Sequence, residues 1–254
     1  MDLANRVYVV TGASSGIGAE TAVMLAKQGA SIAVNYSRNE SGAEETAGRC
    51  REAGGQALVI KGDVAEDSDC RRIAEETMSA WGRIDGLVNN AGTTKFISHA
   101  DLEGLSGEDF RRLYGVNVVG VFQMTRAAAP HMKATGNAAV VNVSSVAGVY
   151  GVGSSIAYAA SKGALNIMTV SLARVLGPEI RVNAVCPGLV ETGFWDGQID
   201  AARKQAIAEG YIKKAPLQRY SRPEETAQSI LYLLTGDPNI TGQLLISDGG
   251  ANIV

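Results

Sequence analysis

The chain has 254 residues, of which 46% are hydrophobic and 19% charged, so it can form one large α/β domain with a sizeable core and is not expected to be disordered. Its net charge of −3 gives no basic surface for nucleic acid, and no apolar run reaches the roughly 18 residues that a membrane span requires. Its three cysteines lack the spacing of a metal site and no signal-peptide pattern precedes the first strand, which predicts a cytoplasmic protein without a metal centre.

Strands and helices alternate along the chain. The expected strands cover residues 6–10, 31–36, 57–60, 86–88, 138–143, 180–185 and 244–246, and the expected helices cover 19–28, 40–53, 67–81, 105–133, 156–176 and 223–234. Residues 193–216 form the longest segment without an expected element. The alternation predicts a doubly wound parallel sheet flanked by helices, formed by a single domain over residues 1–254.

A glycine-rich turn, Thr11-Gly-Ala-Ser-Ser-Gly-Ile-Gly18, lies between the first strand and the first helix. Gly12 permits a tight turn, Gly16 lets the backbone approach a ligand, and Gly18 lets the helix pack against the strand. Backbone N–H groups and the positive end of the helix dipole would then bind a phosphate group. The alternative is an ordinary turn between a strand and a helix.

The same turn contains the pattern Gly-x-Ser-x-Gly at residues 12–16, which is typical of the nucleophile elbow in α/β-hydrolases. Hydrolysis by that mechanism needs a histidine base, normally late in the chain. The histidines are His99 and His131, and none follows His131. The sequence therefore disfavours a hydrolase.

The second strand ends in Asn35-Tyr36-Ser37-Arg38, without a carboxylate. Dinucleotide-binding folds usually carry Asp or Glu at this place, where it binds the ribose 2′-hydroxyl of NAD. An arginine and a hydroxyl suit a 2′-phosphate instead. The sequence therefore favours NADP(H) over NAD(H), and a solvated Arg38 is the alternative.

Polar and small residues follow the next two strands. Asp63 and Val64 come after the third strand, where Asp63 could cap a helix or accept a hydrogen bond from an adenine edge. Asn89-Asn-Ala-Gly92 follows the fourth strand; its small residues would let a cofactor approach, and its amides could brace neighbouring strands.

Asn117 interrupts a long helical pattern and could bind water at a break in the helix, or be incidental.

A serine, a tyrosine and a lysine follow the fifth strand. Tyr158 and Lys162 are four residues apart, so a helix would place them on one face, and Ser145 lies at the end of the strand. An ammonium group beside a phenol should lower the phenol pKa from about 10 toward neutrality. Such a phenol could exchange a proton with a reacting oxygen. The alternative is that the two are simply surface residues, as most pairs with this spacing are.

These residues resemble the short-chain dehydrogenase/reductase family over nearly the whole chain. The matching motifs are Thr11-Gly-Ala-Ser-Ser-Gly-Ile-Gly18, Asp63-Val64, Asn89-Asn-Ala-Gly92, Asn117, Ser145, Tyr158-x-x-x-Lys162 and Pro187-Gly188 with Thr192. The resemblance implies a Rossmann-type fold of seven parallel strands that binds NAD(P) at their carboxyl ends. It also suggests a homotetramer in which the long helices pair between subunits.

The resemblance implies a catalytic tetrad of Asn117, Ser145, Tyr158 and Lys162. Tyr158 would exchange a proton with the substrate oxygen during hydride transfer, and Lys162 would lower its pKa and bind the nicotinamide ribose. Ser145 would hydrogen-bond the substrate oxygen, and Asn117 would hold a water molecule. The expected cofactor contacts are Gly12, Ser14, Ser15, Gly16, Ile17, Gly18, Tyr36, Ser37, Arg38, Asp63, Val64, Asn90, Ala91, Gly92, Tyr158, Lys162, Pro187, Gly188, Val190 and Thr192.

The substrate pocket is expected beneath a lid at about residues 189–216. Its expected contacts are Ser145, Phe96, Tyr150, Phe194 and Trp195. An apolar pocket of this kind fits a hydrophobic ketone or an acyl chain. The Ala33-Val-Asn-Tyr-Ser37 stretch looks like that of the 3-oxoacyl-[acyl-carrier-protein] reductases. Those enzymes usually dock their carrier through basic residues near two helix ends, whereas the turns at 134–138 and 177–180 carry no arginine.

The sequence thus predicts an NADP(H)-dependent oxidoreductase that interconverts a carbonyl and a secondary alcohol, with Tyr158 as acid and base. A hydrophobic ketone or 3-oxoacyl compound is the expected substrate, and a sugar or another secondary alcohol remains open. The alternative from another class is a non-catalytic NADP-binding regulator of the same fold. Such regulators typically lose the tyrosine or the lysine, and this chain keeps both.

Overall fold

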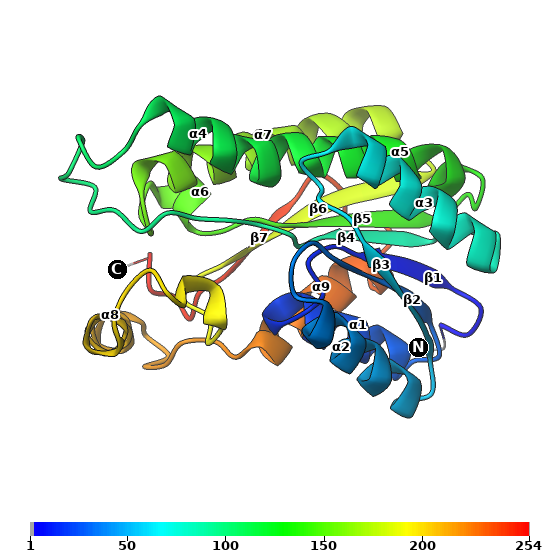
Figure 1. Cartoon of the computed structure of the whole chain (residues 1–254), viewed down its shortest axis with the longest axis horizontal. Helices are drawn as coiled ribbons and strands as arrows, with labels where there is room; N and C mark the ends of the chain where they lie inside the picture. Colours follow the sequence, from blue (N-terminus) through cyan, green and yellow to red (C-terminus); the bar gives the residue numbers. More distant parts are fainter. Residues whose placement is uncertain (1–2, 254) are drawn as a thin grey trace.

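Seven parallel strands form one sheet at the centre of the structure, which is a computed structural model describing residues 3–253 (Figure 1). The strands are β1 (Val7–Val10), β2 (Ser31–Tyr36), β3 (Gln56–Lys61), β4 (Gly86–Asn89), β5 (Ala138–Val143), β6 (Ile180–Pro187) and β7 (Leu244–Ser247). Their order is β3-β2-β1-β4-β5-β6-β7, and every neighbouring pair is parallel. The predicted α/β fold with a doubly wound parallel sheet is confirmed.

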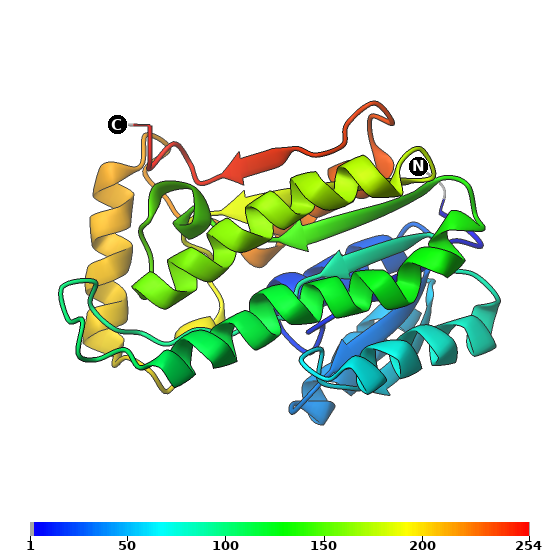
Figure 2. The same ribbon diagram turned by 90° about the horizontal axis from the view of Figure 1, so that it is seen from above.

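Helices cover both faces of this sheet. They are α1 (Gly16–Ala26), α2 (Glu40–Glu52), α3 (Asp67–Trp81), α4 (Gly107–Tyr114), α5 (Val121–Lys133), α6 (Ala147–Tyr150), α7 (Ile156–Leu176), α8 (Ala201–Lys214) and α9 (Pro223–Thr235). Figure 1 shows α1, α2 and α9 below the sheet and α3, α5 and α7 above it. In Figure 2, α8 crosses the left end of the sheet, beyond the tips of the strands. No helix within residues 3–253 is both long enough and apolar enough to span a membrane.

Each face of the sheet has its own apolar core. Val10, Val34 and Val141 belong to the core shared with α1 and α9, and Leu87 and Val140 belong to the core shared with α3 and α5. A strand covered on both faces needs apolar residues at successive positions, because neighbouring side chains point in opposite directions. All four residues of β1 are accordingly buried.

The crevice for a ligand follows from the strand order. The chain proceeds outward from β1 to β3, and it then returns to place β4 on the other side of β1. The loops that leave β1 and β4 therefore diverge at the carboxyl ends of these strands, which is where open α/β sheets bind their ligands.

A chain of buried polar side chains ties β4 to β5 and to α7. Asn89 Nδ2 donates to Asn142 Oδ1 at 2.9 Å and to Thr125 Oγ1 at 3.1 Å. Asn142 Nδ2 in turn donates to Thr169 Oγ1 at 2.9 Å. All four residues are almost completely buried, so each bond satisfies a group that water cannot reach. The sequence interpretation of Asn89 as a brace between strands is confirmed.

The helix expected over residues 105–133 is interrupted. Helix α4 ends at Tyr114, a π-helical turn covers Gly115–Gly120, and α5 begins at Val121. Asn117 lies within this turn, so the break expected at Asn117 is present. Such turns often occur at functional sites, because they leave backbone groups outside the regular helical pattern.

The segment 193–216, expected to be irregular, is largely helical. It contains a short 3₁₀ turn at Gly193–Trp195 and the fourteen-residue helix α8, capped by Asp200, whose Oδ1 accepts from the Arg203 N–H at 2.8 Å. The expectation was wrong because no residue of α8 is buried, so the helix lacks the apolar period that reveals a core-facing helix. Its alanine, arginine and lysine content favours helix all the same.

We predict that Asn142→Ala lowers the free energy of unfolding by about 2 kcal/mol, because it removes two buried hydrogen bonds, one to the Asn89 amide and one to the Thr169 hydroxyl. Urea denaturation followed by circular dichroism measures this change. Asn239→Ala, at an exposed position, is the control. An Asn142→Ala protein as stable as the control would contradict the prediction.

Candidate active site

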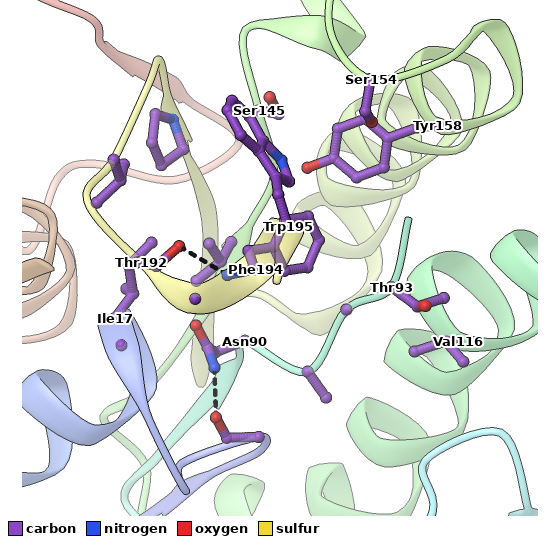
Figure 3. A pocket seen from close by; sticks show the side chains of 18 of the residues that line it. Ile17, Asn90, Thr93, Val116, Ser145, Ser154, Tyr158, Thr192, Phe194 and Trp195 are labelled. Atoms are coloured by element: carbon purple, nitrogen blue, oxygen red, sulfur yellow. Dashed lines mark hydrogen bonds between the residues drawn. The ribbon is translucent and has the colours of Figure 1, made fainter. Parts of the chain in front are cut away.

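A cavity of about 810 Å³ opens at the carboxyl ends of the strands, within the size range of small-molecule sites. In Figure 3, Ser145 and Tyr158 lie toward one end of it, and Ile17 and Asn90 lie toward the other. The predicted site residues that line it are Gly12, Ser14, Ser15, Gly16, Ile17, Ser37, Arg38, Asp63, Val64, Asn90, Ala91, Gly92, Ser145, Tyr158, Lys162, Pro187, Gly188, Val190, Thr192, Phe194 and Trp195. Those outside its lining are Gly18, Tyr36, Phe96, Asn117 and Tyr150.

The glycine turn brings the backbone close to this cavity. Gly12 and Gly16 have positive φ angles of 61° and 56°, which suit glycine. A Cβ on Gly12 would lie 2.8 Å from the Cα atom of Ala91, and one on Gly16 would lie 3.2 Å from Thr192 Cγ2. The first turn of α1 contains no acidic residue, and the Ser15 side chain makes no capping bond, so its N–H groups are available to an anion.

Asn90 fixes the glycine turn to the end of β4. Its Nδ2 atom donates to the carbonyl oxygens of Thr11 and Gly12 at 3.0 and 2.9 Å. A Cβ on Gly18 would lie 2.5 Å from this Nδ2 atom, so Gly18 acts behind the cavity wall by allowing the close packing. The role expected of Gly18 in packing is thus present, although the residue does not reach the cavity.

The end of β2 supplies a second wall. Ser37, Arg38 and Asn39 line the cavity, whereas Tyr36 is buried beneath it. Burial and a hydrogen bond to Glu40 raise the pKa of Tyr36. The tyrosine therefore contacts Glu40, the first residue of α2, rather than the open space.

Asp63 forms the wall after β3. Its Oδ1 atom accepts from the Ala65 N–H at 3.0 Å, and Glu66 rather than Asp63 precedes the first turn of α3. Asp63 therefore stabilises a turn and also faces the cavity. Together with the glycine turn and the Ser37–Asn39 wall, this donor and acceptor set fits a nicotinamide dinucleotide.

The chemical groups meet where β5 ends and α7 begins. Ser145 follows β5, and Ser155 caps α7 by accepting from the Tyr158 N–H at 3.2 Å. One turn later, Lys162 is only 4% exposed, with its Nζ atom 5.7 Å from the centre of the Tyr158 ring. Lys162 Nζ donates to the Val143 carbonyl at 2.8 Å. The helical spacing therefore brings the three residues together, as the sequence predicts.

The pKa values in this cluster depart from the expectation for Tyr158. Burial raises the pKa of Tyr158 to about 12, and the hydrogen bond to Ser145 acts in the opposite direction. Burial also lowers the pKa of Lys162 to about 8. The phenol pKa is therefore raised rather than lowered, because desolvation dominates and the lysine ammonium is bonded to a backbone carbonyl. Tyr158 is a protonated donor at neutral pH.

Asn117 lies one layer behind the cavity. Its Nδ2 atom donates to the Thr93 carbonyl and to Ser161 Oγ, both at 3.0 Å, and its Oδ1 atom accepts from the Thr93 N–H at 2.8 Å. The side chain is completely buried. Asn117 thus joins the loop after β4 to α7, the helix that carries Tyr158 and Lys162.

The remaining wall is apolar and belongs partly to the lid, residues 189–216. Phe194 lies 6.1 Å from Tyr158, ring centre to ring centre, and Trp195 stands beside it (Figure 3). Phe96 packs against Trp195 from outside the cavity, and Tyr150 is 38% exposed and does not reach it. The other apolar lining residues are Val116, Val143, Val146, Ala147, Val152, Leu189 and Ile207.

Several lining residues were not named individually in the sequence interpretation, among them Ile207 and Arg112. Ile207 lines the cavity four residues before Tyr211, which also lines it. This spacing would have indicated their common face if α8 had been recognised as a helix. Arg112 lines the cavity from α4, and nothing in its neighbourhood in the sequence marked it.

Comparisons with known proteins agree with this geometry. The family model described as enoyl-(acyl carrier protein) reductase matches residues 12–252. A Streptomyces violaceoruber protein named as a ketoacyl reductase of granaticin polyketide synthase is 44% identical over 98% of this chain and 96% of its own length. A 3-oxoacyl-[acyl-carrier-protein] reductase of Thermotoga maritima is 36% identical over 98% of this chain and 99% of its own.

A solved structure of levodione reductase matches the fold with a TM-score of 0.92 and 29% identity, covering 99% of both chains. The match extends over the sheet, the glycine turn and the segment with Ser145, Tyr158 and Lys162. The chain therefore belongs to the short-chain dehydrogenase/reductase family of oxidoreductases.

Proposed function

We propose that the protein interconverts a carbonyl compound and a secondary alcohol with NADP(H), using Tyr158 as the acid and base. The observation that carries the proposal is the position of the Tyr158 and Ser145 side chains, which share one cavity with the glycine turn. When bound, the nicotinamide cofactor supplies or accepts the hydride. The comparisons lend no support to the non-catalytic alternative.

The residues divide the proton chemistry among them. Ser145 and Tyr158 hold the substrate oxygen with their hydroxyl groups, which orients the carbonyl carbon toward the cofactor side of the cavity. Tyr158 gives its proton to that oxygen as negative charge develops there. Lys162 is a buried cation beside Tyr158, and its positive charge favours the negative charge that forms during this transfer. In the reverse direction, Tyr158 takes the proton back.

The preference for NADP(H) rests on the wall at the end of β2. Ser37, Arg38 and Asn39 offer a hydroxyl, a guanidinium and an amide, in that order, to the cavity, and none of them is an acid. These groups suit a 2′-phosphate, because the guanidinium binds phosphate oxygens through charge-assisted hydrogen bonds. Glu40, the nearest acid of α2, is bonded to Tyr36.

The substrate class is a hydrophobic ketone or a 3-oxoacyl compound. On the lid side of Tyr158 the cavity is lined by apolar side chains, with Phe194 and Trp195 the largest. Relatives named as ketoacyl and 3-oxoacyl reductases and the similarity to levodione reductase, whose name denotes a ketone, support this class.

The homotetramer and the cytoplasmic location are parts of the same proposal. A shallow groove of about 420 Å³ between α5 and α7 is lined by Phe122, Ala129, Leu172 and Val175. Phe122 and Val175 are 43% and 68% exposed in the single chain. Pairing of these helices between subunits would cover them.

We predict that Tyr158→Phe lowers carbonyl reduction by roughly 10²–10⁴-fold, because the proton donor is lost. The measurement is NADPH oxidation with a panel of β-ketoacyl thioesters, cyclic ketones, α-diketones and keto sugars. Tyr150→Phe, outside the cavity, is the matched control and should retain activity. Turnover of a ketone by the Tyr158→Phe enzyme at the normal rate would contradict the proposed role.

We predict that Arg38→Ala weakens NADPH binding about tenfold and leaves NADH binding unchanged. The substitution removes an exposed, charge-assisted hydrogen bond from the guanidinium to the 2′-phosphate, which NADH lacks. Titration of cofactor fluorescence gives both dissociation constants. Arg111→Ala, whose exposed ion pair with Glu108 lies outside the cavity, is the control. Equal loss of affinity for the two cofactors would mean that Arg38 does not bind the 2′-phosphate selectively.

We predict that kcat/KM for NADPH falls above about pH 8, because Lys162 of the enzyme without bound cofactor loses its proton there. Tyr158 has a raised pKa of about 12 and stays protonated over this range, so it does not cause the fall. Below pH 8 the ammonium is present and the value is level. Lys162→Arg keeps a cation at every pH tested, so its remaining activity should show no fall near pH 8; a fall at the same pH would assign it to another group.

A further inference from the structure

Phe96 joins the lid to the loop that follows β4. Its ring centre lies 5.5 Å from that of Trp195, with the rings nearly perpendicular at 73°. The guanidinium carbon of Arg203 lies 4.9 Å from the centre of the same ring. The Phe96 N–H donates to Gln198 Oε1 at 3.0 Å. One residue of the loop thus contacts three residues of the lid, although its own side chain does not line the cavity.

The loop that carries Phe96 is firmly attached to the rest of the protein. Lys95 Nζ donates to Asp109 Oδ2 at 2.8 Å and to the Gly104 carbonyl at 3.0 Å, which fixes the loop to the start of α4. The Thr94 and Ser154 hydroxyl groups are 2.5 Å apart, and the Ile97 N–H donates to the Ser154 carbonyl at 2.8 Å. Phe96 therefore stands on a rigid support between two anchored neighbours.

The two helical parts of the lid, the 3₁₀ turn at Gly193–Trp195 and α8, bury no side chain of their own. The lid is also held by Tyr211, whose hydroxyl donates to the Asp248 carbonyl at 2.6 Å. Elements with few buried contacts open at low free-energy cost. The Tyr211 contact therefore holds the C-terminal part of α8, and the Phe96 contacts hold the part of the lid from Trp195 to Arg203.

The Phe96 contacts also set the position of the lid over the reacting groups. Trp195, which Phe96 touches, is adjacent to Phe194, and Phe194 lies 6.1 Å from Tyr158. Both lid aromatics line the cavity. A shift of Trp195 away from Phe96 would therefore enlarge the space beside Tyr158 and admit water.

We propose that Phe96 is a positioning residue that holds the lid closed over the substrate and so limits the size of the ketone accepted. The lid opens for substrate entry and product release when Phe96 separates from Trp195, Arg203 and Gln198. The part of this inference that concerns substrate size rests on the proposed carbonyl reduction; the closure of the lid does not.

Trp195 provides a direct probe of the lid. The chain has two tryptophans, Trp81 and Trp195, so Trp81→Phe leaves the lid tryptophan as the single reporter. In this background we expect Phe96→Ala to raise the open population about tenfold, because it removes an aromatic pair and a cation–π contact together. Quenching of Trp195 fluorescence by acrylamide, with NADPH absent and present, measures the exposure.

We call the contacts of Phe96 with Trp195, Arg203 and Gln198 the latch. Two matched variants distinguish loss of the latch from a general loosening of the loop. Phe96→Tyr keeps the ring and should show the quenching of the parent protein. Leu102→Ala removes an apolar side chain from the same loop, where Leu102 is 69% exposed, and should also leave quenching unchanged. Equal quenching in Phe96→Ala and its parent, or an increase of the same size in Leu102→Ala, overturns the proposal.

Kinetics distinguish the latch from the proposed function. In Phe96→Ala, the ratio of kcat/KM for a bulky ketone to kcat/KM for a small one should rise by about threefold or more. The reason is that the aromatic contact with Trp195 limits the volume of the cavity beside Tyr158. Phe96→Tyr should restore the original ratio. A quenching response without turnover of any carbonyl would retain the latch and reject the proposed function. If carbonyls are turned over but Phe96→Ala changes neither the quenching nor the ratio of kcat/KM values, the proposed function is retained and the latch is rejected.

Discussion

The hydrogen bonds of Asn90 join the carboxyl ends of β1 and β4, the two strands beside which the cavity opens. The amide donates to the carbonyl oxygens of Thr11 and Gly12, and the Asn90 N–H donates to Thr11 Oγ1 at 3.0 Å. These bonds hold the glycine turn against the end of β4, so the positive end of α1 faces the same opening as Gly92. The distance between the glycine turn, proposed to bind phosphate, and the groups proposed to transfer the proton is therefore fixed by the sheet rather than by a flexible loop.

Burial controls the chemistry of the Tyr158 and Lys162 pair. Desolvation favours the neutral form of each group, which raises the pKa of the phenol and lowers that of the ammonium. Two titratable groups are thus held near each other in a place where ionising either is costly. A cofactor and a substrate bring further charges and hydrogen bonds into that space, so proton transfer there responds strongly to what is bound.

The sequence predicts best where a function depends on local geometry. The glycine turn, the Tyr158 and Lys162 spacing and the helix break at Asn117 each arise within a few residues, so spacing alone reveals them. Directions of side chains in the folded chain are harder: Tyr36 turns beneath the cavity wall, Phe96 packs behind Trp195, and neither outcome is encoded in its neighbours. Likewise the sign of the Tyr158 pKa shift depends on burial by distant segments, which no spacing rule contains.

Helix α8 has a consequence for how the substrate range of this chain can change. Because none of its residues is buried, most substitutions there should alter folding stability little. Ile207 and Tyr211 are the α8 residues that line the cavity among the residues described. Mutations can therefore accumulate in this helix and reshape the cavity while the sheet, the glycine turn and the Ser145, Tyr158 and Lys162 side chains stay intact. New specificities would evolve here first, at almost no risk to the fold.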